Sequence, residues 1–440
     1  MSQCLAFGVF WIATFWVRVQ NSAMSAVGLR TGLCLLLAAM TPIYGWEKAA
    51  NRRSEKSAIP AAAADRPATA AVNAFGLRLL SELATPAKQK NVFISPLSVF
   101  LALAMTESGS AGPTQAAMRK ALAVAPGVGE DALHQSSSDL LQSRQLHNDV
   151  QFSIANALWS DARLPLASGF VQRCHKLYQA DTTSLDLSSP SAADTINAWV
   201  KQKTHDKIPF IVTPANLLGS TGVLTNAVYF KGGWEYGFIK NLTKEGDFHL
   251  ASSGETASKL KKVRFMHQGS IPGAYRSGPG FEAAALPYRS SGTRLYAILP
   301  ARGKTPEEAL AGISLQSLRD PSEPVELELK LPKFTIDFDA SLKAPLEHMG
   351  MAPAFGPGAD FTPMGSSKFY LSEVLHKTRL EVDEAGTVAA ASTAGVMTLS
   401  ATRPQKTEKK TLVFDRPFAL LLCDTITDTI LFAGVIYDPQ

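Results

Sequence analysis

Residues 384–402, EAGTVAAASTAGVMTLSAT, combine properties that exposed loops and buried strands do not normally share. After Glu384 the segment has neither a charged residue nor a proline until Arg403. Exposed loops normally carry Pro, Asn, Asp or charged residues, whereas buried strands carry larger apolar side chains than the Ala, Ser, Thr and Gly found here. Small side chains tolerate water, fit a tightly packed sheet interior and leave every backbone N–H free to pair. We therefore expect a loop that can also become a central strand of a sheet.

The order of hydrophobic patterns along the chain predicts the fold class. Of 440 residues, 46% are hydrophobic, and no internal linker rich in Pro, Gly and Ser divides the chain after residue 71. Helical spacing comes first and strand patterns follow, without alternation of the two, so we expect an α+β fold in one domain over 71–440. Helices are expected at 72–83, from 96 onward with Ser95 as the cap and Pro96 in the first helical position, and at 114–123, 131–142, 167–177 and 191–205. Strands are expected at 91–94, 151–159, 283–288, 294–300, 325–331, 376–383, 418–423 and 429–436; in 325–331, VELELKL, apolar and charged residues alternate strictly, as in a half-buried strand.

The first 70 residues differ in character from the rest. Arg30 precedes a short apolar run, 32–40, and small residues follow near Gly45, which is the pattern of a secretory signal. The run is too short to span a membrane. We expect residues 1–45 to form a signal region, with translation starting at Met24; an N-terminal tethering helix is the alternative. Residues 46–70, rich in Ala and charged residues, are expected to form a disordered spacer.

Net charge and cysteine spacing give no reason to expect a nucleic-acid partner or a metal site. The chain carries 43 Lys+Arg against 38 Asp+Glu, a formal net charge of +5, which gives no reason to expect a nucleic-acid partner. Outside the signal region only Cys174 and Cys423 remain, without the CxxC or Cys/His spacing of a metal site. The sequence does not fix whether these two cysteines pair. We expect two buried free thiols, no metal and no cofactor.

Motifs of common enzyme classes are missing from the sequence. The chain has no GxSxG and no HExxH, so no motif supports an esterase or a zinc protease. The Gly-Lys-Thr at 303–305 resembles the end of a phosphate-binding loop, but Ile298 stands where the partner glycine should be. A surface turn is the better interpretation, and we expect a protein that is not an enzyme.

Short segments spread over the chain match one known family, in the family's order. They are NVFISPLSV (91–99), INAWVKQKT (196–204), LTNAVYFKGGWE (224–235), LPKF (331–334), MGMAPAF (349–355), ADF (359–361), HKTRLEVDEAGT (376–387), LVFDRPF (412–418) and LFAGVIYDP (431–439). Together they resemble the serpins, the serine-protease-inhibitor family. The resemblance implies the serpin fold, with three β-sheets, about nine helices and an exposed reactive-centre loop at about 384–410.

The resemblance gives polar residues from distant segments a shared role. In serpins, the matches to Ser95, Ser98, Asn226 and His376 form a hydrogen-bonded cluster beneath the main sheet, called the shutter. Such a cluster satisfies buried polar groups without interlocking apolar side chains, so two strands can part and pair again. A catalytic Ser/His/Asn set is the alternative, and we favour the structural role. Trp234 matches a tryptophan at the top of the sheet, the breach, where insertion begins; plain core packing is its alternative role.

The resemblance also implies suicide inhibition. A serine protease attacks the loop and forms an acyl-enzyme; the cut segment then inserts as a new central strand and drags the protease along, which distorts its catalytic site. The start of the loop, the hinge, must enter the sheet, so a charge at Thr387 would hinder insertion but be tolerated in a loop that is exposed beforehand. Non-inhibitory serpins often break this hinge with charged or bulky groups, and they are the alternative. The hinge residues are Glu384, Gly386, Thr387, Ala389, Ala390, Ala391 and Ser392.

Spacing from Gly386 predicts the bond that the protease cuts. In typical serpins the scissile residue lies about fourteen positions after the hinge glycine, which gives Ser400–Ala401. A loop one residue shorter gives Leu399–Ser400, and Leu399 would fill an apolar specificity pocket better. Arg403 is followed by proline, which hinders cleavage after it. The expected partner is therefore a chymotrypsin-, subtilisin- or elastase-like serine protease rather than a trypsin-like one.

Further expectations concern the surroundings of the loop. The mature protein is expected to be a secreted, extracellular monomer that forms a covalent acyl complex with its protease; a periplasmic location is the alternative if the source is bacterial. Residues 403–410, RPQKTEKK, are expected to form a solvated tether. The region 131–149 carries one arginine, Arg144, and two histidines, so no glycosaminoglycan site is expected. Asn241 begins a glycosylation sequon, Asn-Leu-Thr.

Overall fold

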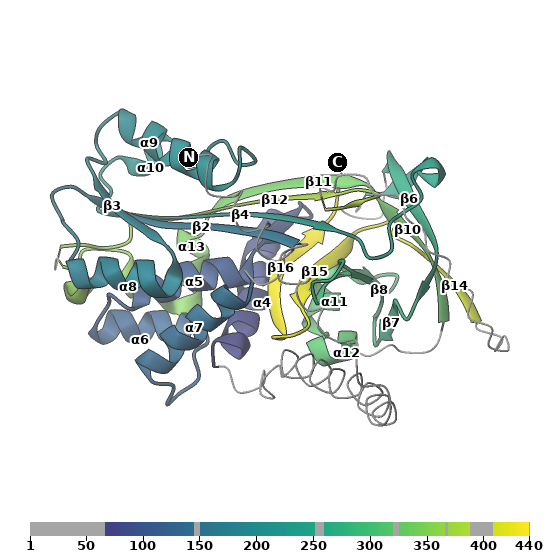
Figure 1. Cartoon of the computed structure of the whole chain (residues 1–440), viewed down its shortest axis with the longest axis horizontal. Helices are drawn as coiled ribbons and strands as arrows, with labels where there is room; N and C mark the ends of the chain where they lie inside the picture. Colours follow the sequence, from purple (N-terminus) through teal and green to yellow (C-terminus); the bar gives the residue numbers. More distant parts are fainter. Residues whose placement is uncertain are drawn as a thin grey trace, which may run out of the picture. The chain divides into compact units, whose positions relative to one another are not determined.

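The computed structural model describes residues 67–144, 150–250, 259–319, 325–365, 368–387 and 408–439 (Figure 1). Within these residues, three sheets and ten α-helical segments, α4 to α13, form an α+β fold. The predicted fold class is confirmed. The predicted helices and strands also occur, because their apolar patterns are local and match the faces that become buried.

The main sheet has the strand order β11-β12-β4-β2-β3, and the short strand β13 pairs with β4. Its two central strands, β4 and β12, are parallel over seven residue pairs, from Glu373↔Val223 to Arg379↔Tyr229. We call this pairing the seam. The bounds are β2 Val150–Asp161, β3 Asp181–Leu185, β4 Gly222–Gly233, β11 Phe334–Ser341, β12 Glu373–Val382 and β13 Gly386–Thr387.

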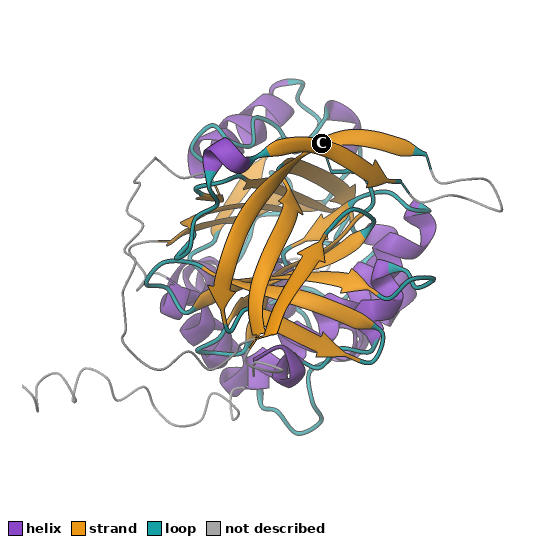
Figure 2. Ribbon diagram, turned by 90° about the vertical axis from the view of Figure 1, so that its right-hand side faces the viewer, coloured by secondary structure: helices purple, strands orange, loops and turns teal. Residues whose placement is uncertain are grey.

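A second sheet has the order β1-β16-β15-β9-β8-β7 and contributes many residues of the hydrophobic core. Figure 2 draws the strands of the protein in orange. Every residue of β15 and β16 is buried, which explains their nearly continuous apolar sequences, FALLLCD and TILFAGVI. Strands covered on both faces have no solvent side for polar residues. The bounds are β1 Val92–Ile94, β7 Tyr275–Gly278, β8 Phe281–Pro287, β9 Thr293–Pro300, β15 Phe418–Asp424 and β16 Thr429–Ile436.

The third sheet has the order β14-β10-β6-β5. In β10 (Val325–Pro332), burial alternates as the sequence predicted. The expected tether at 403–410 is wrong for its last three residues, because β14 (Glu408–Val413) already begins at Glu408 and pairs in parallel with β10. Charged residues are compatible with an edge strand, and the Lys410 ammonium is held by Glu282 at 2.6 Å. The other strands are β5 Lys244–His249 and β6 Leu260–Pro272.

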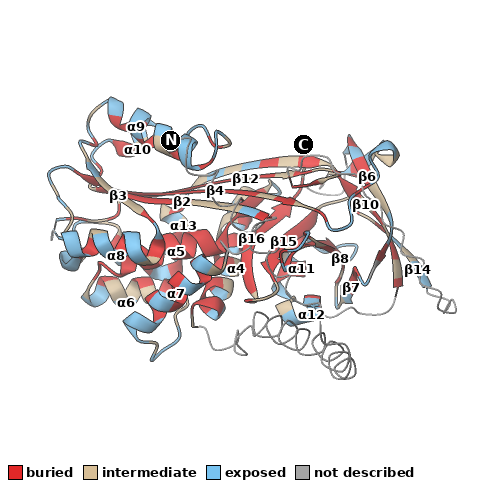
Figure 3. Cartoon of the chain, in the orientation of Figure 1, coloured by how far each residue is buried: buried red, intermediate tan, exposed pale blue. Residues whose placement is uncertain are grey.

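Helices cover both faces of the main sheet (Figure 1). Helix α5 is buried along its whole length (Figure 3), and it opens as predicted, with Ser95 as its cap and Pro96 in its first turn. Helix α9 covers the opposite face, where Ile196 and Val200 are buried. The bounds are α4 Pro67–Ala87, α5 Pro96–Glu107, α6 Gly112–Ala121, α7 Glu130–Arg144, α8 Ser168–Tyr178, α9 Ser191–Lys203, α10 Pro214–Leu217, α11 Pro306–Ala311, α12 Leu315–Arg319 and α13 Lys343–Leu346.

The cysteines and the helix lengths can be compared with the sequence-based expectations. Cys174 and Cys423 are free and buried, which confirms the expectation of two buried thiols. Burial raises the pKa of the Cys174 thiol to about 12, so it stays protonated and unreactive at neutral pH. Among the described residues, no helix is both long and apolar enough to cross a membrane.

Candidate functional site

The site lies where the seam ends and the chain turns back into the main sheet. After β12, the Asp383 amide donates to the Gly386 carbonyl oxygen at 2.9 Å, which closes a tight turn. The Asp383 carboxylate accepts from the amides of Ala385 and Gly386 at 2.9 and 3.1 Å. The chain then returns as β13, which pairs antiparallel with β4 at Gly233 and Gly232. The first residues of the predicted hinge thus begin an additional strand of the sheet.

Only glycine fits at position 386. Its φ of +153° lies in a region that residues with a side chain rarely adopt. A Cβ atom placed there would lie 2.2 Å from the Gly232 carbonyl oxygen and 2.7 Å from the Gly233 Cα. Both clashes are with backbone, so no side-chain movement relieves them. Gly386 therefore allows the hinge to approach β4 closely enough to pair with it.

Thr387 is fully buried, at 0% exposure. Its hydroxyl lies 2.6 Å from the hydroxyl of Tyr288, which is also buried. The expectation of an exposed hinge is therefore wrong at residues 384 and 387, since Glu384 is buried as well. The physical reason is that β13 has already paired with β4 and found a polar partner for its threonine. A charge at Thr387 would consequently disturb the protein even before cleavage.

Trp234 stands at the point where β13 begins. Its ring stacks on that of Tyr288 with the centroids 4.5 Å apart. Its indole N–H donates to the Asp383 carbonyl oxygen at 2.9 Å, and its backbone amide donates to Ala385 at 3.1 Å. The tryptophan therefore holds both sides of the turn that leads into the hinge, in addition to packing in the core.

Glu384 joins the hinge to the neighbouring sheet. Its carboxylate lies 2.8 Å from the Lys333 ammonium and accepts from the Thr243 hydroxyl at 2.9 Å. Burial alone would raise the pKa of Glu384, but the hydrogen bonds from Lys333, its own backbone and Thr243 outweigh burial, so the pKa lies below its usual value. Glu384 is thus ionised at neutral pH.

Beneath the seam, the structure brings together the four residues predicted to form the shutter. The Asn226 side-chain amide donates to the Ser98 hydroxyl, and its carbonyl oxygen lies 2.5 Å from His376 Nδ1. The Ser95 amide donates to His376 Nε2 at 3.2 Å, while its hydroxyl donates to the Leu431 carbonyl oxygen at 2.7 Å. Asn226 and His376 are paired residues of β4 and β12, so this network crosses the seam.

The partners of His376 fix its chemical form. Nε2 accepts from a backbone amide, so the proton sits on Nδ1 and is donated to Asn226. Burial lowers the pKa of His376 to about 3, and the ring is neutral. Because its lone pair is already used, His376 cannot take a proton from either serine. The arrangement fits a structural network rather than a catalytic set.

Sequence reasoning missed several residues of this site. Asn156 accepts from Asn226, and the Thr378 hydroxyl donates to the Phe93 carbonyl oxygen at 2.7 Å. Tyr288 ends the expected strand 283–288, and Lys333 lies in the family-matching segment LPKF, but neither was predicted to contact the hinge. A polar residue within an apolar strand pattern is the only sequence signal for such a site residue. It shows that the side chain needs a hydrogen-bond partner but does not identify that partner. Among the described residues, no group of His, Cys, Asp and Glu is arranged to hold a metal ion.

Other predicted site residues lie outside the described residues. These are the later hinge residues and those flanking the expected scissile bond: Ala389, Ala390, Ala391, Ser392, Leu399, Ser400 and Ala401.

Comparison with known proteins identifies the family. The family model described as Serpin (serine protease inhibitor) matches residues 70–439. The chain belongs to the serpin family. The plasma serine protease inhibitor of Bos taurus is 33% identical over 420 residues, covering 92% of this chain and 100% of the relative. The leukocyte elastase inhibitor of Sus scrofa is 31% identical over 394 residues, covering 84% and 99%.

Solved structures agree on the fold. Human thyroxine-binding globulin has a TM-score of 0.75 at 25% identity, covering 86% of this chain and 100% of that protein. Human glycosylated kallistatin has a TM-score of 0.74 at 28% identity, covering 85% and 97%. The serpin fold is therefore shown, and the relatives include named inhibitors of serine proteases.

Proposed function

We propose that this protein is a secreted serine-type endopeptidase inhibitor that acts as a suicide substrate. The observation that carries the proposal is the pairing of Gly386 and Thr387 with β4, which starts a new strand where the seam ends. A segment of uncharged and mostly small residues follows directly in the sequence, from Val388 to Thr402. The start of an additional strand is thus followed by a sequence able to continue it.

The proposed reaction begins as ordinary proteolysis. The protease serine attacks a carbonyl carbon of the loop, the peptide bond breaks, and the loop is left as an ester on the enzyme. The freed segment, including Ala389 to Ser392, then lengthens β13 between β4 and β12. About ten to fifteen new backbone hydrogen bonds, at about 1 kcal/mol each, would supply on the order of 10 kcal/mol. Insertion drags the bound protease away before water can release it.

The shutter suits the movement that this reaction requires. Strands β4 and β12 must part along the seam, and a network of short polar side chains can exchange partners without repacking large apolar groups. In this proposal Ser95, Ser98, Asn226 and His376 hold the seam closed until insertion opens it, and Trp234 and the hinge define where insertion starts.

The target class and the cleaved bond remain those that the sequence favours. We propose cleavage at Leu399–Ser400 or Ser400–Ala401 by a chymotrypsin-, subtilisin- or elastase-like enzyme. The apolar Leu399 supports the first choice, and the names of the relatives support a serine protease as the target. The apolar run after Arg30 supports a signal region at 1–45 with a spacer to residue 70, so that the mature inhibitor acts outside the cell as a monomer.

A gel experiment tests the proposal. The purified protein is incubated with chymotrypsin, elastase, subtilisin and trypsin, and then boiled in SDS. A band at the summed mass of inhibitor and protease is expected, and protease with its active-site serine blocked should give none. Mass spectrometry of the released C-terminal peptide identifies the bond; a peptide that begins at Pro404 would make the target trypsin-like.

Two substitutions at one position sharpen this experiment. Thr387→Arg should convert the inhibitor into a substrate, because the buried site beside Tyr288 cannot accept a guanidinium and the strand cannot grow past it. Thr387→Ser keeps the hydroxyl and should still form the complex. Equal amounts of complex from both variants would contradict the role of this hinge.

A non-inhibitory serpin is the second candidate. The likeness to human thyroxine-binding globulin favours it, because that protein's name describes binding rather than inhibition. The two candidates differ in the gel experiment: an inhibitor gives the complex, whereas a non-inhibitory serpin gives only cleaved chain with every protease.

A further inference from the structure

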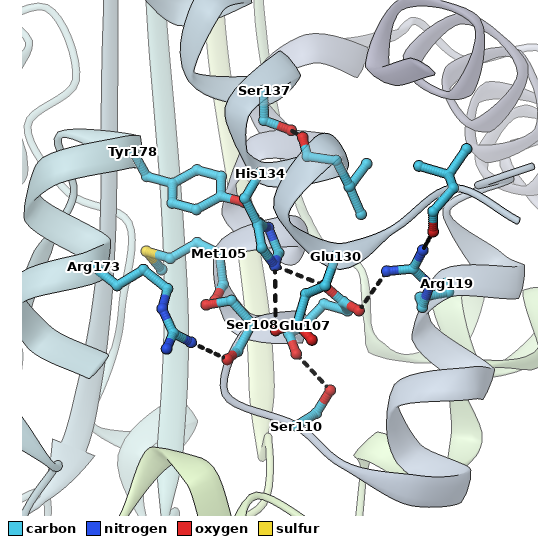
Figure 4. Close-up of polar contacts among 12 residues, drawn as sticks. Met105, Glu107, Ser108, Ser110, Arg119, Glu130, His134, Ser137, Arg173 and Tyr178 are labelled. Atoms are coloured by element: carbon cyan, nitrogen blue, oxygen red, sulfur yellow. Dashed lines mark hydrogen bonds and ion pairs between the residues drawn. The ribbon is translucent and has the colours of Figure 1, made fainter. Parts of the chain in front are cut away.

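A polar cluster lies buried where helices α5, α6, α7 and α8 meet, apart from the seam and the hinge (Figure 4). Glu107 is the last residue of the buried helix α5 and is 0% exposed. His134 faces it from helix α7 and is 3% exposed. Two ionisable side chains thus lie in the core without any role in strand insertion.

The contacts of these two side chains are incomplete. His134 Nδ1 lies 2.6 Å from the Tyr178 hydroxyl on α8. His134 Nε2, however, lies 3.5 Å from Glu107 Oε2 and 3.7 Å from Glu130 Oε1, which is too long for a hydrogen bond. Within the described residues, neither Nε2 of His134 nor Oε2 of Glu107 has a hydrogen-bond partner. The contact between α5 and α7 therefore contains two facing polar atoms that are buried and lack a hydrogen bond.

The charges around His134 come from every helix of the cluster. The Arg119 guanidinium on α6 lies 3.2 Å from Glu107 Oε1 and also donates to the Val128 carbonyl oxygen. Arg173 on α8 donates to the Ser108 carbonyl oxygen at 2.6 Å. Glu130, one turn before His134 on α7, has a half-exposed carboxylate. Two cations therefore accompany the two carboxylates.

These surroundings favour an uncharged ring. Burial lowers the pKa of His134 most strongly; Glu130 raises it in part, and the two guanidiniums of Arg173 and Arg119 lower it again. Burial likewise raises the pKa of Glu107, against the opposing effect of Arg119. At neutral pH the imidazole is neutral, although a carboxylate lies close to it.

We propose that His134 makes the attachment of helix α7 sensitive to pH, so that acid releases this helix from α5 and α8. In its place between the helices, the ring is held neutral by burial and by the two arginines. When α7 lifts away, water reaches the ring and it accepts a proton. Release of the helix is therefore coupled to the uptake of one proton by the ring, and no other molecule is needed.

The sign and size of the effect follow from proton linkage. The released ring titrates near its ordinary pKa of about 6.5, whereas the packed ring titrates lower. Below about pH 6.5 the released ring binds more protons than the packed ring, which favours release by up to about tenfold for each pH unit. Glu107 has the opposite linkage, because its pKa is raised in the packed form, so protonation of Glu107 reduces the effect at the acid end of this range. The effect is absent above that pH and ends at the lower pKa of the packed ring.

Hydrogen exchange of the full-length protein tests the proposal. Protection factors of the amides of residues 130–144, corrected for the intrinsic pH dependence of exchange, are measured at pH 7, 6 and 5. They should fall by up to about tenfold per unit below pH 6.5. Protection in α7 that stays constant from pH 7 to 5 would overturn the proposal.

A matched pair of variants assigns the effect to one histidine. His134→Gln removes the titrating ring and should abolish the pH dependence of protection in α7. His175→Gln makes the same change at an exposed position on α8 and should leave that dependence unchanged. If His134→Gln kept the wild-type pH dependence, His134 would not be the responsible group.

Glu107→Gln tests whether the packed His134 ring is neutral or charged. This test remains valid even if the His134→Gln variant does not fold. A glutamine can still accept from Arg119, and its amide N–H can donate to the unpaired His134 Nε2. With a neutral ring in the packed state, protection of α7 at pH 7 should rise. If it falls instead, the packed ring is an imidazolium paired with Glu107, and acid would tighten the contact rather than release it.

Discussion

The shutter and the hinge, the two ends of the candidate site, differ in which strand pairs with β4. At the shutter, β4 and β12 pair directly and the network from Asn226 to His376 crosses between them. At the hinge, the chain has already turned back and Gly386 and Thr387 pair with β4. Insertion would therefore start from a strand that already exists and would have to open only the part that the shutter holds. In this proposal, insertion starts at the hinge, whereas the resistance to strand separation comes from the shutter at the other end of the seam.

Cleavage of the loop should give the largest change. If β13 lengthens as proposed, the cut protein gains on the order of 10 kcal/mol of stability. Melting curves before and after a limited digest measure this gain, and Thr387→Arg, cut in the same way, should show much less. A melting temperature that does not rise after a confirmed single cut would mean that no strand inserts.

At the shutter, His376→Ala should destabilise the native protein by about 2–3 kcal/mol, because it leaves Asn226 and the Ser95 amide buried without their partner. Urea unfolding measures the loss. The exposed His348 serves as control, and His348→Ala should change stability by less than about 0.5 kcal/mol.

The same variant should flatten the pH dependence of stability. The folded pKa of His376, about 3, lies below the unfolded value of about 6.5. Its contribution is therefore complete above pH 6.5 and is lost as the pH falls toward 3, because the unfolded chain takes up the proton first. A wild-type slope in His376→Ala would contradict a buried neutral ring.

At the hinge, Glu384→Gln should destabilise by about 1–2 kcal/mol, because Lys333 and Thr243 lose a charged acceptor. Glu384 has a lowered pKa, so its contribution is present above about pH 4.3 and is lost as the pH falls further. Asp247→Asn, which breaks the exposed pair with Lys262, should change stability by less than about 0.5 kcal/mol. Equal losses from the two variants would mean that the Glu384 contact is only a surface ion pair.

The smallest effect is expected from Tyr288→Phe, which removes the hydroxyl next to Thr387 and should reduce stability by about 1 kcal/mol. Tyr296→Phe is the matched control. In the described part of the chain the Tyr296 hydroxyl is buried without a hydrogen bond, so its removal should be neutral or stabilising. If both variants lost the same stability, the hydroxyl pair at the hinge would contribute nothing specific.

The sequence predicted those features that depend on local pattern. The alternation in β10, the cap at Ser95 and the apolar strand β15 follow from residues close together in the chain. Composition also predicted that the hinge can enter a sheet. It did not show that Thr387 is already inside one, because the partner that satisfies its hydroxyl, Tyr288, is 99 residues away.

The shutter also depends on contacts between distant segments, which local sequence patterns do not reveal. Ser95, Asn226 and His376 come from three distant segments, and only the resemblance to a family joined them before the structure did. Strand β14 was partly missed for a different reason: the charged residues Glu408, Lys409 and Lys410 suggest solvent, yet an edge strand keeps such side chains in water while its backbone pairs. His134 was placed on a helix, but periodicity did not reveal that it faces a glutamate.

The stacking of Trp234 on Tyr288 makes the breach visible to spectroscopy. The indole is 1% exposed and donates its N–H to Asp383 at the entry to the hinge, so any movement of that turn changes the polarity and the hydrogen bonding of an excited indole. Its emission should shift to longer wavelength when water enters the breach and return when a strand fills it. Trp234 can thus serve as a fluorescent reporter of the movement proposed for this turn.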